Sequence, residues 1–553
     1  MASHSDTEGS KMIPREGPKI SREKFLPYIP LALVLAVVFY VRIRLLPVPL
    51  ERDEGEFAYM GQLLLKGIPP FTHAYTMKLP GVSVMYALIM LLFGQTSTGI
   101  HTGLLIVNTA CMYLVYLLSK RLFDNNAALF SCASYGLLSL SASVFGVFAH
   151  ATHFAVLFAL TGILLLSSSI KNRQMSLLLI SGLCFGAAVS MKQHAVLFLI
   201  FAVLYFVWCF WKNPASDKKY FSTGSAIFLL SAITPYALIV LWMLNAGSFA
   251  NFWFWTVQYA GEYSSGVPLT LGWNEFTRSF GIIALSQLPL WILAGSGGVL
   301  LCIKKRDCAD RPFVFGFILF SLLANCPGLY FRKHYFILLL PAVAVLVGGG
   351  LSSVGRLFSS LKRVQITPLL PVFLLGVAVT YGFYNEREIF FTLTPLEVSR
   401  ATYGANPFPE SIQIANYIKN NTTPNDTIAV LGSEPEILFY ADKLSATGHI
   451  YMYGLMEGHQ YAERMQMQMI YEIEAARPAY IVFVNVETSW LNQESSVQTV
   501  FNWSRSYIGK QYDRVGVVDI IDSNTTHYLW EDKAVKYTPV SDSYITIFKK
   551  RGW

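Results

Sequence analysis

Long apolar stretches separated by short basic clusters are the feature that most restricts how this 553-residue chain can fold. A membrane-spanning helix needs about 20 predominantly apolar residues. Charged residues make up only 14% of the chain, against roughly 25% in soluble proteins, which indicates a polytopic membrane protein. About eleven stretches qualify as spans: 26–47, 100–118, 127–147, 153–170, 175–191, 195–211, 222–245, 277–302, 312–329, 335–353 and 367–384.

The basic clusters orient these stretches, because Lys and Arg concentrate in cytoplasmic loops. With residues 1–25 in the cytoplasm, every even-numbered stretch ends inside, and each of those ends is basic. The clusters are Lys120 and Arg121; Lys171 and Arg173; Lys212, Lys218 and Lys219; Lys304, Lys305 and Arg306; and Arg356, Lys362 and Arg363. The run 81–94 is short for a span, so we predict a helix lying at the membrane interface. The N-terminus is then cytoplasmic and the C-terminal part of the chain is outside.

Residues 385–553 have the composition of a soluble domain with its own core. Periodicity predicts helices over 411–421 and 461–478, and strands over 426–432, 479–486, 514–521 and 543–550. The chain thus divides into a cytoplasmic segment (1–25), a membrane domain (26–384) and an outer α/β domain (385–553). We expect the outer domain to pack over the outer loops or to guide an acceptor. The seven cysteines fit no metal-binding spacing, and we interpret them as small apolar residues.

Polar residues that topology does not explain gather on the predicted outer side. No ionisable residue lies near the middle of a predicted span, where transporters usually carry them. Both signs of charge instead meet at one face, as in an active site at the membrane surface. These residues are Asp53, Glu54, Glu56 and Lys78 in the first outer loop (48–99); His150 and His153; Lys192 and His194; Glu262, Glu275 and Arg278; and Arg332, Lys333 and His334.

Each of these features also has a purely structural interpretation. Asp53 and Glu56 have the spacing of a capping box for a helix ending near Gly67. Lys78 could anchor the chain at the interface, and Arg332 with Lys333 could bind lipid headgroups. His150 and His153 could be packed histidines. The aromatic segment 249–273 could be an interfacial belt or a lid over a site.

Two stretches carry a family resemblance. The segments "RDEGEFAYMGQLLLKGIPPF" (52–71) and "YTMKLPGVSVMYALIMLLFG" (75–94) resemble the first outer loop of GT-C glycosyltransferases. The resemblance is to enzymes of the protein O-mannosyltransferase-like and aminoarabinose-transferase-like kind (glycosyltransferase family 39 type). It extends to "GAAVSMKQHAVLFLI" (186–200), to "YFRKHYFILLLPAVAVL" (330–346) and to the C-terminal region, so it covers most of the chain.

The resemblance implies a role for each matching residue. Asp53 corresponds to the catalytic aspartate and Glu54 to its acidic neighbour. Lys78 corresponds to a lysine that contacts the carrier phosphate, and Lys192, Arg332, His334 and Tyr335 match positions near that phosphate. Glu56, Tyr59 and His153 are candidates for binding acceptor or sugar. Two departures leave the sugar and the acceptor open: histidines stand where many relatives carry a carboxylate or Asn, and Glu56 stands where aminoarabinose transferases have Arg.

The implied protein is a GT-C membrane enzyme of the bacterial inner membrane. It would move a sugar from a polyprenyl-phosphate donor to an acceptor hydroxyl on the outer face, where the envelope acceptor is a glycolipid, a polysaccharide or a protein. One base, Asp53, predicts inversion, because retention needs a second, nucleophilic carboxylate and the adjacent Glu54 diverges by about 100° on a helix. The resemblance establishes no cofactor; a divalent metal near the acidic pair stays open, as in some relatives, but the sequence shows no clear ligand set. A lipid-linked-sugar flippase or transporter and a non-catalytic envelope assembly protein are the alternatives.

Overall fold

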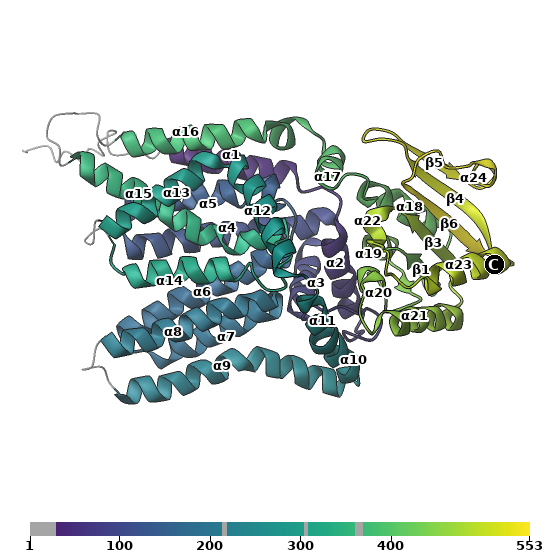
Figure 1. Ribbon diagram of the computed structural model, residues 1–553, viewed down its shortest axis with the longest axis horizontal. Helices are drawn as coiled ribbons and strands as arrows, with labels where there is room; N and C mark the ends of the chain where they lie inside the picture. The colour runs from purple at the N-terminus through teal and green to yellow at the C-terminus, as the bar shows by residue number, and fades with distance from the viewer. Residues whose placement is uncertain (1–28, 213–217, 304–307, 360–368) are drawn as a thin grey trace, which may run out of the picture.

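The computed structural model describes residues 29–212, 218–303, 308–359 and 369–553, and it divides into a helical bundle and an α/β domain (Figure 1). The bundle helices lie side by side, and the α/β domain sits at one end of them. The N-terminal segment 1–25 and the basic residues Lys304, Lys305, Arg306, Lys362 and Arg363 lie outside the described residues. The bundle comprises α1 (Ile29–Arg44), α4 (Ser97–Leu122), α5 (Asn125–Leu138), α6 (Ala151–Asn172), α7 (Met175–Met191), α8 (Val196–Lys212), α9 (Lys218–Asn245), α13 (Leu288–Ile303), α14 (Arg311–Leu323), α15 (Leu340–Ser359) and α16 (Leu370–Asn385).

The apolar stretches are helical as predicted, with two corrections. The stretch 277–302 is not one helix but α12 (Leu269–Ser286) followed by α13, bent by 101°. Pro289 in the first turn of α13 explains the break, because proline has no N–H to continue the hydrogen bonds of α12. The stretch 127–147 is helical only to Leu138 and continues as a 3-10 turn, η3 (Ala142–Val144), where serine side chains compete for the backbone.

Length and composition qualify five of the described helices as spans, or six if the bent pair is one span. Four more apolar helices are shorter, so the count of eleven spans stays a prediction. The qualifying segments are Ser97–Leu122, Ala151–Asn172, Gln193–Lys212, Lys218–Asn245 and Leu340–Phe358.

The first outer loop forms two helices between the bundle and the α/β domain, α2 (Arg52–Leu65) and α3 (Gly81–Phe93). The predicted interfacial helix is thus present as α3. A capping box does start α2, but its residues are Glu51 and Glu54 rather than Asp53 and Glu56. The side chains of Asp53 and Glu56 are therefore not the ones that cap the helix.

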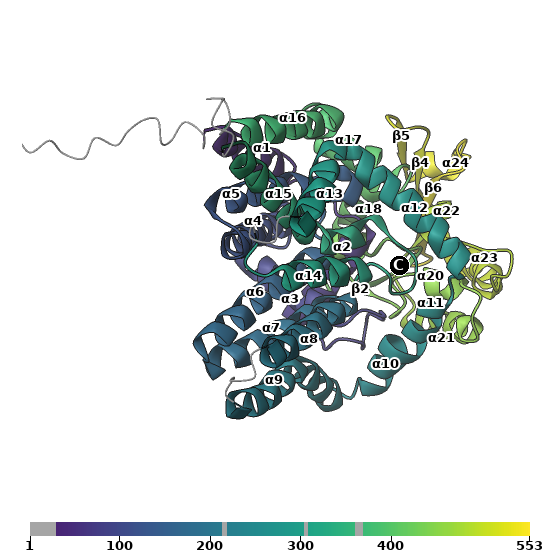
Figure 2. The same ribbon diagram turned by 60° about the vertical axis from the view of Figure 1, so that its left-hand side comes forward.

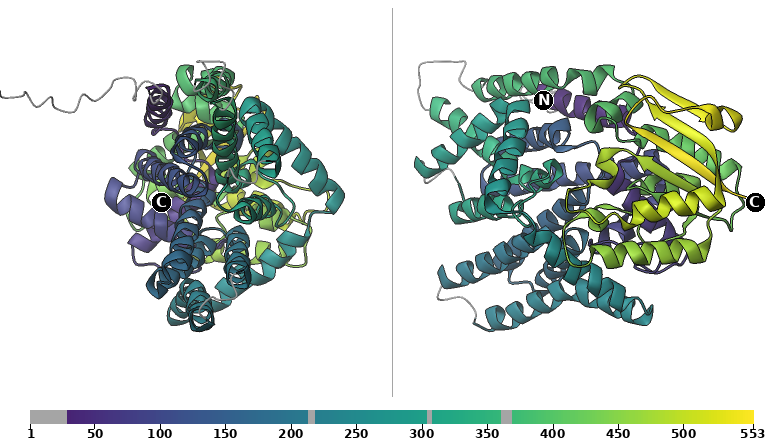
Figure 3. Two further views of the ribbon diagram at one scale, coloured as in Figure 1. Left: turned by 90° about the vertical axis from the view of Figure 1, so that its left-hand side faces the viewer. Right: turned by 45° about the vertical axis from the view of Figure 1, so that its right-hand side comes forward.

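A six-stranded sheet organises the C-terminal domain, in the order β2-β1-β3-β6-β4-β5. β2, β1 and β3 are parallel, and the remaining pairs are antiparallel. All the predicted strands and helices are found, and the C-terminus lies at the end remote from the bundle (Figure 3). The strands are β1 (Thr427–Leu431), β2 (Leu444–Ser445), β3 (Tyr480–Asn485), β4 (Tyr512–Ile520), β5 (Thr526–Trp530) and β6 (Tyr544–Lys550). The helices are α17 (Pro395–Tyr403), α18 (Phe408–Asn420), α19 (Pro435–Ala441), α20 (Tyr453–Met456), α21 (Ala462–Ala476), α22 (Glu487–Trp490), α23 (Thr499–Gln511) and α24 (Asp532–Lys536), with a π-helical turn η7 (Glu388–Thr392) before them.

The domain packs directly over the first outer loop, as expected. Helix α19 lies against α2 so closely that a Cβ added to Gly55 would be 2.7 Å from the Glu436 nitrogen. The Tyr59 hydroxyl accepts a hydrogen bond of 2.9 Å from the Ser445 nitrogen. The α/β domain is therefore part of the surroundings of α2.

The aromatic outer segment packs against the same domain (Figure 2). It forms α10 (Phe249–Trp253), the π-helix η5 (Phe254–Tyr259) and α11 (Ala260–Ser265). The Tyr259 hydroxyl donates to Glu457 at 2.9 Å, and Phe254 meets Tyr461 edge-on. The segment thus joins the bundle to the domain.

Candidate functional site

The centre of the site is the first turn of α2, where Asp53 meets Lys78. The Lys78 ammonium donates to Asp53 Oδ1 at 2.7 Å and to Glu56 Oε2 at 2.6 Å. The chain brings Lys78 there through the tight packing of Gly81, where an added Cβ would lie 2.5 Å from the Ser190 carbonyl oxygen. Asp53 and Lys78 remain partly exposed, at 19% and 23% of their side-chain surface. The structure thus pairs Asp53 with Lys78 and leaves both partly accessible.

The second oxygen of Asp53 faces two histidines. Oδ2 lies 3.9 Å from His150 Nδ1 and 4.0 Å from His334 Nε2, and the two imidazole rings stack at 4.2 Å. His150 precedes α6, and His334 lies in the 3-10 helix η6 (Lys333–Leu338). One carboxylate oxygen is thus held by a lysine, while the other faces the site.

Two further cations of the site each lie over a tyrosine ring. The Lys192 ammonium lies 4.1 Å from the Tyr335 ring centroid, and the Arg332 guanidinium lies 5.5 Å from that of Tyr330. Within the described part of the chain, neither cation has a carboxylate oxygen within 4.0 Å. Their charges are therefore available to an anion, whereas the charge of Lys78 is already shared by two carboxylates.

The charges in this cluster shift its pKa values. Burial would raise the pKa of Asp53, but the charge and hydrogen bond of Lys78, together with His150 and Lys192, outweigh burial and hold that pKa well below its usual value. Burial raises the pKa of Glu56 despite the same lysine. Burial lowers the pKa of Lys192 to about 7, although Asp53 opposes the shift. Burial likewise lowers the pKa of His150 to about 4. At neutral pH Asp53 is charged and His150 is neutral.

Glu54 points away from Asp53 and is fully buried. Its Oε1 accepts hydrogen bonds from the Ala149 nitrogen and pairs with His101 Nε2 at 2.9 Å, while Oε2 accepts from the Glu51 nitrogen at 3.1 Å. Because Ala149 precedes His150, Glu54 fixes the histidine loop against α2. Both oxygens of Glu54 are thus occupied by hydrogen bonds within the protein.

His101 is a member of this network that the sequence analysis missed. Its Nδ1 lies 2.8 Å from the Leu46 carbonyl oxygen, which can only accept, so Nδ1 carries a proton. The remaining ring nitrogen shares a proton with Glu54. A lone histidine in an apolar helix gives no local signal. Its part in the network becomes visible only in the folded structure, where it contacts Glu54, which is 47 residues away in the sequence.

Two predicted site residues do not reach the site. His153 is 0% exposed, and neither ring nitrogen has a hydrogen-bond partner among the described residues. It lies in the first turn of α6 and is fully buried. Tyr59 is also 0% exposed, and its hydroxyl is used by Ser445 at the domain junction. Neither side chain is exposed in this structure, and the binding roles of these two residues stay predictions.

Asp53, His150 and His334 together fit a divalent metal. Their ligand atoms lie within 4.8 Å of one another, and both nitrogens of His150 lack a hydrogen-bond partner in the described structure. Neutral imidazoles and a carboxylate are ligands suited to zinc. The three residues come from separate outer segments, which is why sequence spacing alone showed no ligand set.

Comparisons with known proteins agree with this architecture. Residues 75–239 match the sequence model of the family described as dolichyl-phosphate-mannose-protein mannosyltransferase. No protein in a search of curated sequences matches. The chain is similar in structure to ArnT from Cupriavidus metallidurans in the apo state, with a TM-score of 0.57, 13% identity, and coverage of 94% of this chain and 97% of that chain.

Two ligand-bound structures are also similar. ArnT from Cupriavidus metallidurans bound to undecaprenyl phosphate gives a TM-score of 0.54 at 13% identity, covering 94% of this chain and 97% of that chain. The oligosaccharyltransferase AglB from Archaeoglobus fulgidus, in complex with an inhibitory peptide and a dolichol-phosphate, gives 0.52 at 13% identity, covering 92% and 75%. The chain is a membrane protein with the GT-C fold, and the resemblance found in its sequence is confirmed.

Proposed function

We propose that this protein is a glycosyltransferase that moves a sugar from a polyprenyl-phosphate donor to an acceptor hydroxyl at the outer face of the membrane. The observation that supports this most is a carboxylate with one oxygen facing the site, near two cations that have no carboxylate partner among the described residues. Asp53 Oδ2 faces the site beside Lys192 and Arg332, which have no carboxylate partners within the described residues. Fold-level similarity to proteins solved with lipid phosphates bound agrees with such a donor.

The cations serve the leaving group. When the bond between the anomeric carbon and the phosphate oxygen breaks, the electron pair stays on the phosphate. A phosphate monoester has a second pKa near 6, so it leaves without a strong acid but gains from fixed positive charge. Lys192, which lies over the Tyr335 ring, and Arg332 would supply that charge, with His334 next to Tyr335.

Asp53 serves the acceptor. As the acceptor oxygen bonds to the anomeric carbon, its proton passes to Asp53 Oδ2. A donor phosphate that shares the protons of Lys78 weakens the hold of Lys78 on Asp53 and raises the basicity of that carboxylate. Donor binding would thereby prepare the base, and a single base acting opposite the leaving group gives inversion.

A divalent ion held by Asp53, His150 and His334 would add positive charge near the phosphate, but it would occupy Oδ2, so metal binding and the general-base role of that oxygen are alternatives. The protein's own residues carry the remaining steps: Glu54 fixes the His150 loop, and Glu56 keeps Lys78 oriented. We further propose a bacterial inner membrane, with the site and the α/β domain on the periplasmic side. The basic clusters of the even-numbered loops support that orientation.

The test is mass spectrometry of envelope glycoconjugates and lipid-linked sugars. Cells lacking the protein are compared with cells that express the wild type, Asp53→Asn or Asp442→Asn at equal levels. Asp442 is a matched control, because it also pairs with a lysine of the α2 region, Lys66, at 2.6 Å, but far from the site. We expect one sugar to vanish from its acceptor in the null and the Asp53→Asn cells, with the lipid-linked donor accumulating.

The control variant should behave as wild type. General-base help is worth about 10²–10⁴-fold, so a transfer rate for Asp53→Asn within a factor of two of wild type would rule the proposal out. A transport or assembly role would then remain. Because the missing sugar and its acceptor are both identified by mass, the same experiment names the substrates.

A further inference from the structure

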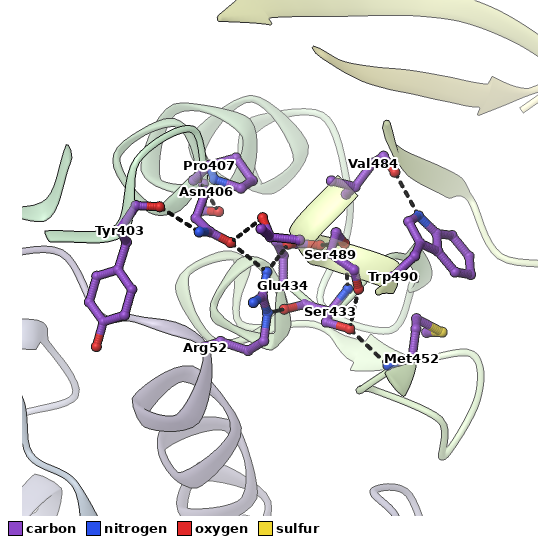
Figure 4. A network of polar contacts seen from close by, with 12 residues as sticks. Arg52, Tyr403, Asn406, Pro407, Ser433, Glu434, Met452, Val484, Ser489 and Trp490 are labelled. Atoms are coloured by element: carbon purple, nitrogen blue, oxygen red, sulfur yellow. Dashed lines mark hydrogen bonds and ion pairs between the residues drawn. The ribbon is translucent and has the colours of Figure 1, made fainter. Parts of the chain in front are cut away.

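The residue next to Asp53 belongs to a different environment. Arg52 is 7% exposed, and its guanidinium reaches out of the membrane domain into the α/β domain (Figure 4). Nε donates to the Ser433 carbonyl oxygen at 2.5 Å, and one terminal nitrogen donates to the Tyr453 hydroxyl at 2.6 Å. The other donates to Asn406 Oδ1 and to Glu434 Oε1, both at 2.9 Å. Every nitrogen of the guanidinium is therefore used.

The acceptors stand at a recognisable place in the domain. Ser433 and Glu434 follow the carboxyl end of β1, and Ser489 in α22 follows the carboxyl end of the neighbouring parallel strand β3. In open α/β sheets, the crevice outside the carboxyl ends of parallel strands is where ligands bind. Here a side chain of the protein's own membrane domain occupies that position.

The network around Arg52 is closed and buried. Ser489 Oγ donates to Glu434 Oε2 at 2.6 Å, and the Met452 nitrogen donates to Ser433 Oγ at 2.8 Å. Glu434 is 0% exposed. Met452 lies next to Tyr451, whose ring is 5.5 Å from the Lys78 ammonium. The same network therefore holds Arg52 and a wall of the candidate site.

We infer that the α/β domain positions the catalytic aspartate by clamping Arg52 in its sheet crevice. Successive side chains on a helix diverge by about 100°, so fixing Arg52 in the crevice fixes the direction of Asp53 toward the histidines. Arg52 and Glu434 are positioning residues in this account, which in its functional part rests on the proposed function. The domain then serves as more than a cover over the outer loops.

The clamp is tested first without reference to activity. Amide hydrogen exchange of the first turn of α2 is measured by mass spectrometry in the full-length protein in nanodiscs, for the wild type, Arg52→Gln and Arg400→Gln. Arg400 is the matched control: it pairs with Glu410 within the C-terminal region and is equally buried, and although it donates to the Asn406 carbonyl oxygen it contacts none of the atoms that accept from Arg52. We expect exchange at residues 52–57 to be at least about tenfold faster in Arg52→Gln and unchanged in Arg400→Gln.

Equal exchange in Arg52→Gln and wild type, or equal acceleration in both variants, would overturn the clamp. If Arg52→Gln does not fold, the isosteric Glu434→Gln takes its place with the same two outcomes.

The second arm measures sugar transfer in cells by the mass-spectrometric assay above. We expect transfer to fall at least about tenfold in Arg52→Gln at equal protein level, and to recover partly in Arg52→Lys, which keeps the charge but reaches fewer acceptors. Full transfer in Arg52→Gln while Asp53→Asn is inactive would refute the positioning role alone. Full transfer in Asp53→Asn would refute the proposed function, and the exchange measurement would still decide the clamp.

Discussion

The first turn of α2 carries an ion pair between a carboxylate and a cation on each of two sides, and the two pairs differ in their surroundings. On one side, Arg52 and Glu434 pair at 2.9 Å with side-chain exposures of 8% and 0%, and every polar atom of the guanidinium has a partner. On the other, Asp53 and Lys78 pair at 2.7 Å but keep about a fifth of their surface exposed. A closed buried pair holds structure, and an open pair with a free oxygen can react.

The comparison also separates the two neighbouring carboxylates of the outer loop. Asp53 has one oxygen facing the site, whereas both oxygens of Glu54 accept hydrogen bonds inside the protein. Leaving a buried polar group without its hydrogen-bond partner costs about 1–3 kcal/mol of stability. We therefore expect Glu54 to stabilise the structure of the site rather than to take part in the reaction. The predictions below test whether exposure and saturation are the features that divide function from structure.

The largest effect is expected at the unpaired cations. Arg332→Ala and Lys192→Ala should each lower sugar transfer by about 10²–10³-fold, because each removes positive charge where the phosphate leaves. Transfer by purified protein with its identified donor is the measurement. Arg278→Ala is the matched control, because this outer arginine is 75% exposed and faces Glu275 at 4.0 Å. An equal loss in Arg278→Ala would show that overall outer charge, rather than these two positions, governs the reaction.

A smaller effect is expected at the saturated carboxylate. Glu54→Gln should lower transfer about tenfold, because one carboxylate oxygen accepts from His101 and the Ala149 nitrogen and the other accepts from the Glu51 nitrogen, and an amide NH2 group cannot replace an accepting oxygen. The control is Glu436→Gln in α19. Burial and the charge of Glu434 raise the pKa of Glu436 to about 8, so this group is already neutral at pH 7 and the amide replaces it closely.

Transfer and the thermal unfolding midpoint are measured for both variants. If Glu436→Gln lost as much activity as Glu54→Gln, burial alone would account for the effect and the specific role of Glu54 would be withdrawn.

Much of this arrangement was predictable from the sequence, because it follows local patterns. The apolar periodicity predicts the helices, and the alternation of topology places Lys192 and Arg332 at the same outer face as Asp53. The 25-residue separation of Asp53 and Lys78 is bridged by a motif that the family resemblance identifies. Each of these features can be read from a short segment of sequence, together with the side of the membrane at which that segment is predicted to end.

The remaining features depend on packing between distant segments. Arg52 and Glu434 are 382 residues apart, and nothing near either residue marks it as a partner of the other. The sequence does not distinguish the capping box of α2 from a pair two residues later, because Glu51 with Glu54 and Asp53 with Glu56 have the same spacing. Only the tertiary position of Lys78, which draws Asp53 and Glu56 away from the helix end, selects between them.

A pH dependence of several-fold is expected for donor binding. Burial lowers the pKa of Lys192 to about 7, so its positive charge is present below that pH and is lost as the pH rises through it. The affinity for undecaprenyl phosphate, used as the probe, should therefore fall several-fold between about pH 6.5 and 8.5. Calorimetric titration of the protein in detergent across this range is the measurement.

Lys192→Arg is the control for that titration, because arginine stays charged throughout the range. The substitution should flatten the fall in affinity. A fall of equal steepness in the wild type and in Lys192→Arg would assign the dependence to another group.

The smallest effect is expected at the contact between the two regions, and it concerns stability. Gly55→Ala places a methyl group 2.7 Å from the Glu436 nitrogen, which is backbone and cannot move aside cheaply. Overpacking of this kind typically costs about 1–3 kcal/mol. The control is Gly509→Ala in α23, where a Cβ meets nothing within 4 Å and the helix gains roughly 0.5–1 kcal/mol. Thermal unfolding should therefore move in opposite directions for the two alanines. A midpoint for Gly55→Ala at or above that of the wild type would show that the α/β domain yields at this contact, and a domain that yields there could not hold the first turn of α2 in one orientation.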